Sequence, residues 1–192
     1  PNRLREMLHG QLRISDFSTK LVLLFSGRRR KQCVTEIRVA GCTAAQLAEA
    51  VDALMRIDTL TNRQSNLLAC PDHYLLEPRG DVLEVIETTG GSPMPARFFM
   101  RFEDESGLVA ARDPAYSHQS VGTARLGDGT VIGGVRHQFR DEGSGAMARL
   151  MVEFPAATPG QMIRAHQWHL ACEFSHWLAE AAQARRRAAP AI

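Results

Sequence analysis

This chain is poor in aromatic residues and lacks the paired cysteines that organise small metal-binding or disulfide-rich domains. Only 6% of its 192 residues are aromatic, and its four cysteines include no C-x-x-C pair. Widely spaced cysteines indicate buried free thiols, which argues against a zinc ribbon and a redox dithiol. No basic segment followed by an apolar segment and a cleavage site opens the sequence, so we expect a reducing, cytoplasmic location.

Strong net charge and long apolar runs are also absent. The formal net charge is +2, and no run reaches the roughly 18 apolar residues that a membrane span needs, so we expect no membrane partner. Basic residues gather at Arg28–Lys31 and Arg185–Arg187 without a zinc-finger or RRM signature, which argues against a nucleic-acid partner. The length fits one domain, 1–192, that can enclose a ligand cavity. The sequence leaves open whether the protein forms a homodimer.

The first part of the chain predicts a mixture of helix and strand. Residues 3–25 mix apolar and polar positions, and they indicate a short helix followed by a strand or a second helix. Residues 33–39 alternate like a half-buried strand, which Gly41 ends. Thr43 is a suitable N-cap for a helix over 44–55.

The rest of the chain predicts an antiparallel sheet followed by one long helix. Short alternating runs separated by turns fill 72–154 and indicate six or so strands, and Pro159-Gly160 precedes a helix over about 161–184. A curved sheet of this size cannot bury its concave face alone, so the helix must lie across it. This order resembles the α+β helix-grip architecture of Bet v 1-like and START proteins, with 1–32 as an extension and 185–192 as a frayed tail. A UTRA or chorismate-lyase-like sheet remains an alternative.

The final predicted helix concentrates the side chains that could perform chemistry. At about 100° per residue, five ionisable side chains fall on one arc: His166, His169, Glu173, His176 and Glu180. The arc borders an apolar stripe, which consists of Ile163, Leu170, Phe174, Trp177 and Ala181. Histidine and glutamate hold transition metals or move protons near neutral pH, so this helix is the first place to look for a site.

Within the arc, His169 and Glu173 form an H-x-x-x-E element. A spacing of four residues places the two side chains one turn apart, where they could chelate one ion. Such pairs are also common on solvent-facing helix surfaces, so further ligands elsewhere in the chain must decide between the two interpretations.

Strand parity predicts which further side chains face the helix. Successive strand residues point to opposite faces of a sheet. In 131–139 the apolar parity includes Val135 and Phe139, and His137 shares it, so His137 should point into the cavity.

The same argument selects a glutamate and a second histidine. In 81–88, Glu87 shares the parity of Val85 and should point inward, whereas Glu84 should point outward. His73 shares the parity of Leu75 on the preceding strand. A histidine and a glutamate from paired strands can then meet the histidine and glutamate of the helix.

These four residues, His73, Glu87, His169 and Glu173, form a candidate zinc site. Zn²⁺ accepts imidazole nitrogen and carboxylate oxygen in tetrahedral sites. With an exchangeable position, such a metal polarises a carbonyl or activates water. The alternative is structural, because His73 could cap a turn and Glu87 could lie exposed at a strand end.

Four segments resemble the 2,4-diacetylphloroglucinol hydrolase and phloretin hydrolase family. They are Pro71-Asp72-His73-Tyr74, Val85-Ile86-Glu87-Thr88-Thr89-Gly90-Gly91, Gly133-Gly134-Val135-Arg136-His137 and His169-Leu170-Ala171-Cys172-Glu173-Phe174. The resemblance implies a Bet v 1-like fold and a zinc ion held by the four residues named above. It also implies hydrolysis of a carbon–carbon bond between an acyl group and a polyhydroxylated aromatic ring.

Further residues follow from that chemistry. The departing ring carbon must take up a proton, and His137 or His118 could donate it because an imidazole pKa lies near neutral pH. Tyr116 could offer a phenol to the substrate. The ligand would be a small aromatic or polyketide-like molecule. We expect the cavity wall to include Phe98, Met100, Phe102, His166, Leu170 and Trp177.

Two other functions fit the same sequence. The first is a metal-free START-like polyketide cyclase or hydrophobic-ligand-binding protein, which would use the aromatic cavity residues and His137. The second is a lyase or ligand-sensing domain of the chorismate-lyase or UTRA kind, which would recognise an anion through Arg97, Arg101 and Arg136. Metal content separates the hydrolase from both.

Overall fold

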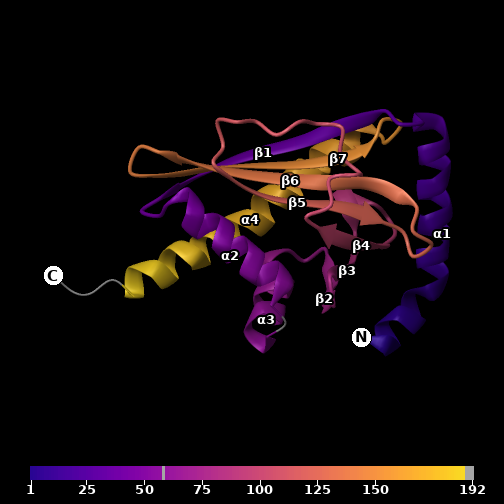
Figure 1. Ribbon diagram of the computed structural model, residues 1–192. Helices are drawn as coiled ribbons and strands as arrows, with labels where there is room; N and C mark the ends of the chain where they lie inside the picture. The colour runs from indigo at the N-terminus through magenta and orange to yellow at the C-terminus, as the bar shows by residue number, and fades with distance from the viewer. Residues whose placement is uncertain (58, 189–192) are drawn as a thin grey trace.

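A seven-stranded antiparallel sheet crossed by one long helix forms the body of the structure (Figure 1). The structure is a computed structural model, and it describes residues 1–57 and 59–188. The helical elements are α1 (Asn2–Ser26), α2 (Ala44–Arg56), α3 (Leu60–Ala69), the 3₁₀ turn η1 (Thr89–Gly91) and α4 (Gly160–Ala188). The strands are β1 (Arg30–Ala40), β2 (His73–Arg79), β3 (Val82–Glu87), β4 (Ala96–Phe102), β5 (His118–Arg125), β6 (Val131–Glu142) and β7 (Gly145–Pro155).

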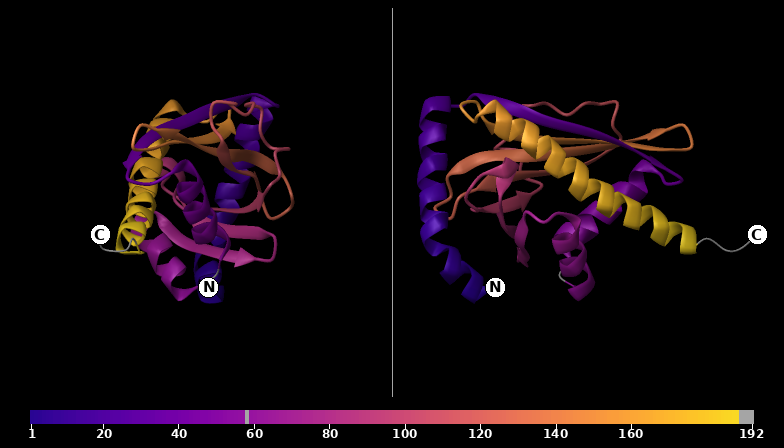
Figure 2. Two further views of the ribbon diagram at one scale, coloured as in Figure 1. Left: turned by 60° about the vertical axis from the view of Figure 1, so that its left-hand side comes forward. Right: turned by 180° about the vertical axis from the view of Figure 1, so that it is seen from behind.

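The strand order is β1-β7-β6-β5-β4-β3-β2, and every neighbouring pair is antiparallel. The six strands β2 to β7 form the predicted meander, and β1 returns to pair with β7. The predicted α+β helix-grip fold is confirmed, because the long C-terminal helix lies across the sheet as expected (Figure 2).

The apolar stripe of α4 forms the main core against the sheet. Leu170, Phe174 and Trp177 are buried together with Phe139 of β6 and Leu150 of β7. Helix α2 adds buried side chains to the same cluster, and its first turn is closed by the predicted cap. Thr43 accepts from the backbone N–H of Gln46, whose side chain returns the bond in a capping box.

The helical segments differ from the sequence-based expectation in three places. Residues 2–26 form one 25-residue helix rather than a short helix and a second element, and one side of this helix lies against the end of the sheet, where it contacts β4 and β7. Helix α3 over 60–69 was not predicted. Helix α4 continues to Ala188, so only 189–192 of the expected tail remain, and they lie outside the described residues. No helix of 1–57 and 59–188 is long and apolar enough to cross a membrane.

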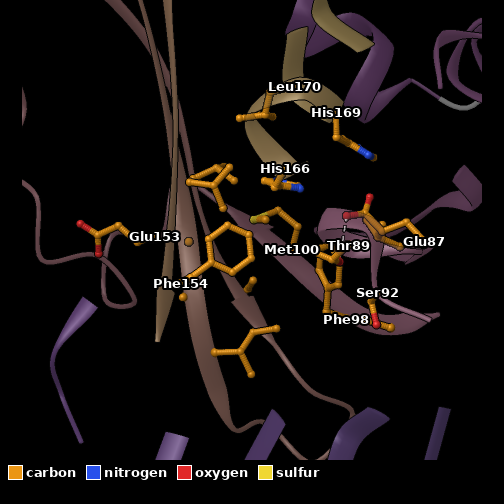
Figure 3. Close-up of a pocket in the computed structure, with 18 of the residues that line it drawn as sticks. Glu87, Thr89, Ser92, Phe98, Met100, Glu153, Phe154, His166, His169 and Leu170 are labelled. Carbon is orange, nitrogen blue, oxygen red and sulfur yellow. Dashed lines mark hydrogen bonds between the residues drawn. The ribbon is translucent and has the colours of Figure 1, made fainter. Parts of the chain in front are cut away.

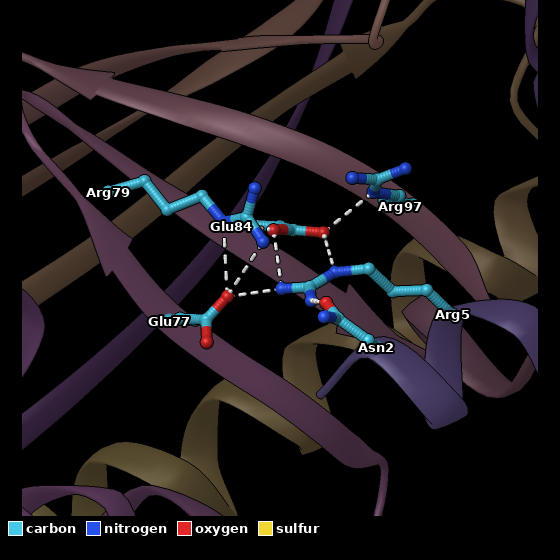
Figure 4. A network of polar contacts seen from close by, with 6 residues as sticks. All are labelled: Asn2, Arg5, Glu77, Arg79, Glu84 and Arg97. Atoms are coloured by element: carbon cyan, nitrogen blue, oxygen red, sulfur yellow. Dashed lines mark hydrogen bonds and ion pairs between the residues drawn. The ribbon is translucent and has the colours of Figure 1, made fainter.

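Helix α1 stands at one end of the sheet and is tied to it by a buried ionic network (Figure 4). The carboxylate of Glu84 on β3 is fully buried, accepts from Arg5 of α1 at 2.9 Å and from Arg97 at 2.7 Å, and forms an ion pair with Arg79 at 2.7 Å. Arg5 and Arg79 also bind Glu77 of β2. Glu84 therefore points away from the cavity, as strand parity predicts.

Candidate metal centre and cavity

A cavity of about 440 Å³ lies between the concave face of the sheet, helix α4 and helix α1 (Figure 3). Its wall is mostly apolar and includes Phe98, Met100 and Phe102 of β4 and Leu170 of α4. Glu87, His137, His166, His169 and Glu173 supply polar groups to the same wall. The cavity is thus mostly apolar, and its imidazoles and carboxylates gather along the side that faces α4.

The structure brings the four predicted ligands together. The Nε2 atom of His73 lies 3.2 Å from Nε2 of His169, 3.3 Å from Oε1 of Glu173 and 3.9 Å from Oε2 of Glu87. Nε2 of His169 lies 3.8 Å from Oε2 of Glu173. All four residues are buried. Two imidazoles and two carboxylates from β2, β3 and α4 therefore converge on one point.

A β-bulge sets the direction of His73. His73 pairs with Glu87, but the register shifts before Leu75, which pairs with Ile86. After the bulge it is Leu76 that lines the cavity, so the predicted common parity of His73 and Leu75 is wrong. The extra residue lets His73 face the site while the rest of β2 keeps its own alternation.

The turn after β3 holds Glu87 against α4. Gly90 has φ 60°, and a Cβ there would lie 2.4 Å from the carbonyl oxygen of Met162, so only glycine permits this close approach. The hydroxyl of Thr89 donates to Oε1 of Glu87 at 3.2 Å, as Figure 3 shows. The carboxylate is thereby oriented from the side opposite to His73.

Outer contacts fix both imidazole rings. Nδ1 of His73 lies 2.7 Å from the backbone carbonyl oxygen of Asn66, so Nδ1 carries the proton and Nε2 presents its lone pair to the cluster. Nδ1 of His169 lies 3.5 Å from Oδ2 of Asp72, which accepts at its other oxygen from Thr88 at 2.8 Å. Carbonyls and carboxylates in these positions are the usual outer partners of metal-bound histidines.

Burial dominates the electrostatics of the site. Desolvation lowers the pKa of His73, and it raises the pKa of Glu173 well above its usual value, with the charge of Glu87 adding to the effect. Burial also lowers the pKa of His137 and of His166 to about 3. Both rings are therefore neutral at neutral pH.

The donor set fits a transition metal. Nδ1 of His73 is committed to a carbonyl, so its Nε2 faces Nε2 of His169 and the carboxyl oxygens of Glu87 and Glu173. Two imidazoles with two carboxylates are a ligand set that Zn²⁺ accepts. Among the described residues, the triplets whose donor atoms all lie within 4.8 Å of one another are Cys70–His73–His169 and Glu87–His166–His169. Glu173 adjoins them through its contacts with His73 and His169.

Several residues of this centre were missed by the sequence argument. Three residues lie behind the two imidazoles. Asn66 contacts His73, Asp72 contacts His169, and Sγ of Cys70 lies 3.6 Å from Nδ1 of His169. His166 was expected only as a wall residue, but its ring stacks on His169 with centroids 5.0 Å apart. The adjacency of Asp72 and His73 was the one available signal, because a backbone carbonyl has no signature in the sequence.

Three predicted site residues lie elsewhere. Tyr116 is buried beneath the guanidinium of Arg140, away from the cavity wall. His118 lies at the start of β5 and does not line the cavity. Trp177 packs behind the wall, against Phe174 and His73. Tyr116 lies in the loop before β5, and strand alternation does not predict the direction of a loop side chain.

The C-terminal members of the α4 arc also lie outside the site. His176 pairs with Glu180 at 3.4 Å on a partly exposed face, and Glu180 accepts from Ser65 of α3. The arginines of the anion-binding alternative point away from the cavity as well. Arg97 binds Glu84, Arg101 binds Asp81 and Arg136 binds Glu105, so that alternative loses its proposed anion site.

The comparisons with known proteins define the fold class. The aromatase/cyclase Zhui from Streptomyces sp. R1128 is similar to this chain with a TM-score of 0.52 at 12% identity, over 85% of this chain and 100% of that one. Ara h 8.0201 matches with a TM-score of 0.49 at 12% identity, over 81% and 99%. Norcoclaurine synthase of Thalictrum flavum matches with a TM-score of 0.47 at 10% identity, over 82% and 97%.

The protein therefore has the helix-grip α+β fold. No family profile matches the sequence, and no curated protein sequence matches it. At identities near 12% the structural similarity establishes the fold alone.

Proposed function

We propose that this protein is a zinc-dependent hydrolase that cleaves the carbon–carbon bond between an acyl group and a hydroxylated aromatic ring. The observation that carries the proposal is the convergence of His73, Glu87, His169 and Glu173, whose donor atoms lie 3.2 to 3.9 Å from one another across the contacts given above. The ligand types and the H-x-x-x-E element are those of the hydrolase family that the sequence resembles.

The cavity suits a flat, uncharged substrate. Its volume of about 440 Å³ lies in the usual range for sites that bind small molecules. Phe98, Met100 and Phe102 supply apolar surface to an aromatic ring, and the neighbouring arginines of the sheet point to the opposite face. An anionic substrate would find no matching cation on these strands.

The chain's own residues have two tasks in this reaction, and the substrate must meet a third requirement. The four ligands would hold the ion, which when bound supplies a Lewis acid that polarises a carbonyl or lowers the pKa of water. The apolar wall excludes bulk water, which strengthens electrostatic interactions inside the cavity. The site must also let the departing ring carbon take up a proton, and ring hydroxyls assist that step because they allow the ring to tautomerise.

His137 serves a different role from the one that an ordinary imidazole pKa suggests. Burial lowers its pKa to about 3, so the ring is neutral at neutral pH and does not hold an extra proton that it could donate as a general acid. Its Nδ1 is buried and has no hydrogen-bond partner among the residues that the structure describes, and the ring lines the cavity. A neutral imidazole in this position donates to or accepts from a ring hydroxyl, and thus orients the substrate.

Metal analysis combined with a hydrolysis assay tests the proposal. The purified protein is expected to contain about one zinc per chain and to release a carboxylic acid and the free ring from an acylated polyhydroxybenzene probe. Chelation should stop the release, and added zinc should restore it. A protein that releases product equally well with and without chelator would overturn the proposal.

A second candidate function is a metal-free polyketide cyclase or hydrophobic-ligand-binding protein. The fold similarity to an aromatase/cyclase and the apolar wall around neutral His137 favour it. This protein would bind aromatic probes with the same affinity in the presence and absence of chelator. It would also retain that affinity when Glu173 is replaced by Gln.

A further inference from the structure

Helix α1 presents its polar side to the cavity and its apolar side to solvent. Ser15, Ser18, Thr19 and Val22 line the cavity. The opposite side carries large apolar side chains that are 44 to 76% exposed. We call this row the outer stripe, and it consists of Met7, Ile14, Phe17, Leu21, Leu24 and Phe25.

The described residues, 1–57 and 59–188, leave the outer stripe uncovered. Helix α1 lies wholly within the described residues, and only Leu12 and Ser26 of its 25 residues are buried. The helix stands at the end of the sheet in Figure 1 and in the right-hand view of Figure 2, where no other element is drawn on its outer side. The outer stripe is therefore not part of the core.

Both ends of α1 are anchored, so the helix cannot roll to bury the stripe. Arg5 is held by Glu84 and Glu77 near the N-terminal end (Figure 4). Near the C-terminal end the hydroxyl of Ser26 accepts from the backbone N–H of Ala157 at 2.8 Å. Turning the stripe inward would break a buried ionic network and would also push Ser15 and its neighbours out of the cavity wall.

The spacing of the stripe is that of a helix–helix contact. Met7, Ile14, Phe17, Leu21 and Leu24 follow intervals of seven, three, four and three residues, which is the 3.5-residue repeat of a packed helical seam. The missing seam position between Met7 and Ile14 is Gly10. The row is thus continuous over nearly five helical turns.

Gly10 is the seam position that has no side chain. It lies in the interior of α1, where glycine costs about 1 kcal/mol relative to alanine. Within the described chain, nothing lies within 4 Å of a Cβ built at this position, so crowding inside the protein does not require glycine. A second backbone approaching the seam at this point does require it.

The area of the stripe fits a protein–protein contact. Its six side chains expose roughly 600 Å² together, taking about 150–250 Å² for a whole aromatic side chain and less for the aliphatic ones. Monomeric proteins rarely show larger apolar patches. A stable interface buries about 800 Å² on each partner, so the stripe with its polar rim is of the right size.

We propose that two copies of this chain associate through the outer stripe of α1, with the two helices crossing closely at Gly10. The contact is isologous, because each copy presents the same stripe to the other. Association covers the apolar side of α1 and thereby holds its polar side as the end wall of the cavity. A lipid surface is less suited to this face, because a glycine within the stripe adds no apolar area.

Analytical ultracentrifugation of matched variants tests the proposal. The wild type is expected to sediment as a dimer at micromolar concentration. Leu24→Asp should raise the dimer Kd at least 100-fold, because it buries a charge at the seam. Leu68→Asp is the control, since Leu68 on α3 is 75% exposed and Leu24 is 76% exposed, and it should leave the dimer unchanged. Circular dichroism should confirm that both variants are folded.

Gly10→Ala separates a close helix crossing from a solvated face. A methyl group at the crossing should weaken the dimer about tenfold in Kd, whereas on a solvated helix it would only raise the melting temperature. A monomeric wild type, a dimer that survives Leu24→Asp, or an unaltered Kd in Gly10→Ala would overturn the proposal. Binding of the monomer to anionic phospholipid vesicles through the stripe would also overturn it.

Discussion

His73 and His169 lie 96 residues apart in the sequence, yet their Nε2 atoms are 3.2 Å apart inside the protein. One ring comes from an edge strand of the sheet and the other from the C-terminal helix. Each ring is oriented from behind, His73 by the carbonyl of Asn66 and His169 by Asp72. Two imidazole nitrogens and two carboxylates therefore lie within contact distance of one another in the interior of the protein.

Replacement of Glu173 by Gln is expected to abolish zinc retention and to leave the fold intact. The two side chains have nearly the same size, so packing is kept, but an amide is a much weaker zinc ligand than a carboxylate. Elemental analysis should find at most about a tenth of the wild-type zinc, since even outer-partner changes weaken metal affinity 10–100-fold.

His176→Ala is the matched control for this change. His176 lies on the same helix but pairs with Glu180 on a partly exposed face. This variant should retain zinc at the wild-type level. Equal zinc content in Glu173→Gln, His176→Ala and the wild type would refute the ligand assignment.

Asp72→Asn tests the orientation of His169. Without its charge, residue 72 stabilises the Nδ1 proton of His169 less well, and zinc affinity should fall about 10–100-fold. Competition with a chromophoric chelator measures that change. The control is Asp81→Asn, because Asp81 pairs only with exposed Arg101 among the contacts described. Equal affinities in the two variants would mean that Asp72 has no role at the site.

The buried imidazole of His137 should make stability fall in acid. Its pKa is about 3 in the folded protein and 6.5 in a model side chain, so the unfolded chain binds the proton first as the pH falls. The contribution of the neutral ring is complete above about pH 6.5 and declines toward pH 3, by up to about 1.4 kcal/mol per pH unit.

Urea denaturation of the wild type and His137→Gln at pH 7, 5.5 and 4.5 measures this contribution. The variant lacks the titrating ring, so its free energy of unfolding should decline less steeply over that range. Other titrating groups are common to both proteins and cancel in the difference. Parallel pH profiles would show that His137 is accessible to protons in the folded state.

Glu84→Gln should loosen helix α1. The Glu84 carboxylate has no exposed surface, accepts from Arg5 and Arg97, and pairs with Arg79. Removal of its charge should lower the free energy of unfolding by about 2 kcal/mol, the scale of hydrogen bonds to charged groups. Hydrogen exchange should also rise in α1 before it rises in the sheet.

Glu103→Gln provides the comparison for the ionic network. Glu103 pairs with Arg56 at the surface, where its side chain is 71% exposed, and such pairs contribute at most about 1 kcal/mol. Its unfolding free energy and α1 exchange rates should stay near those of the wild type. Similar losses in both variants would mean that burial of Glu84 adds nothing to the anchoring of α1.

The sequence determined those features that depend on local repeat. The spacing of four residues places His169 and Glu173 on one side of a helix, and alternation sends Glu87 and His137 inward and Glu84 outward. Turn residues and alternation also gave the antiparallel meander and the helix that crosses it, because those patterns follow from backbone geometry over a few residues.

Only the tertiary structure decided how these elements meet. The bulge after His73, the carbonyl of Asn66 behind that ring and the place of Tyr116 away from the cavity depend on packing between distant segments. The orientation of α1 also depends on packing, because the local sequence does not decide which of its two sides faces the cavity. The side of α1 that lines the cavity is fixed by the anchoring of Arg5 to Glu84, a contact between residues that no local pattern connects.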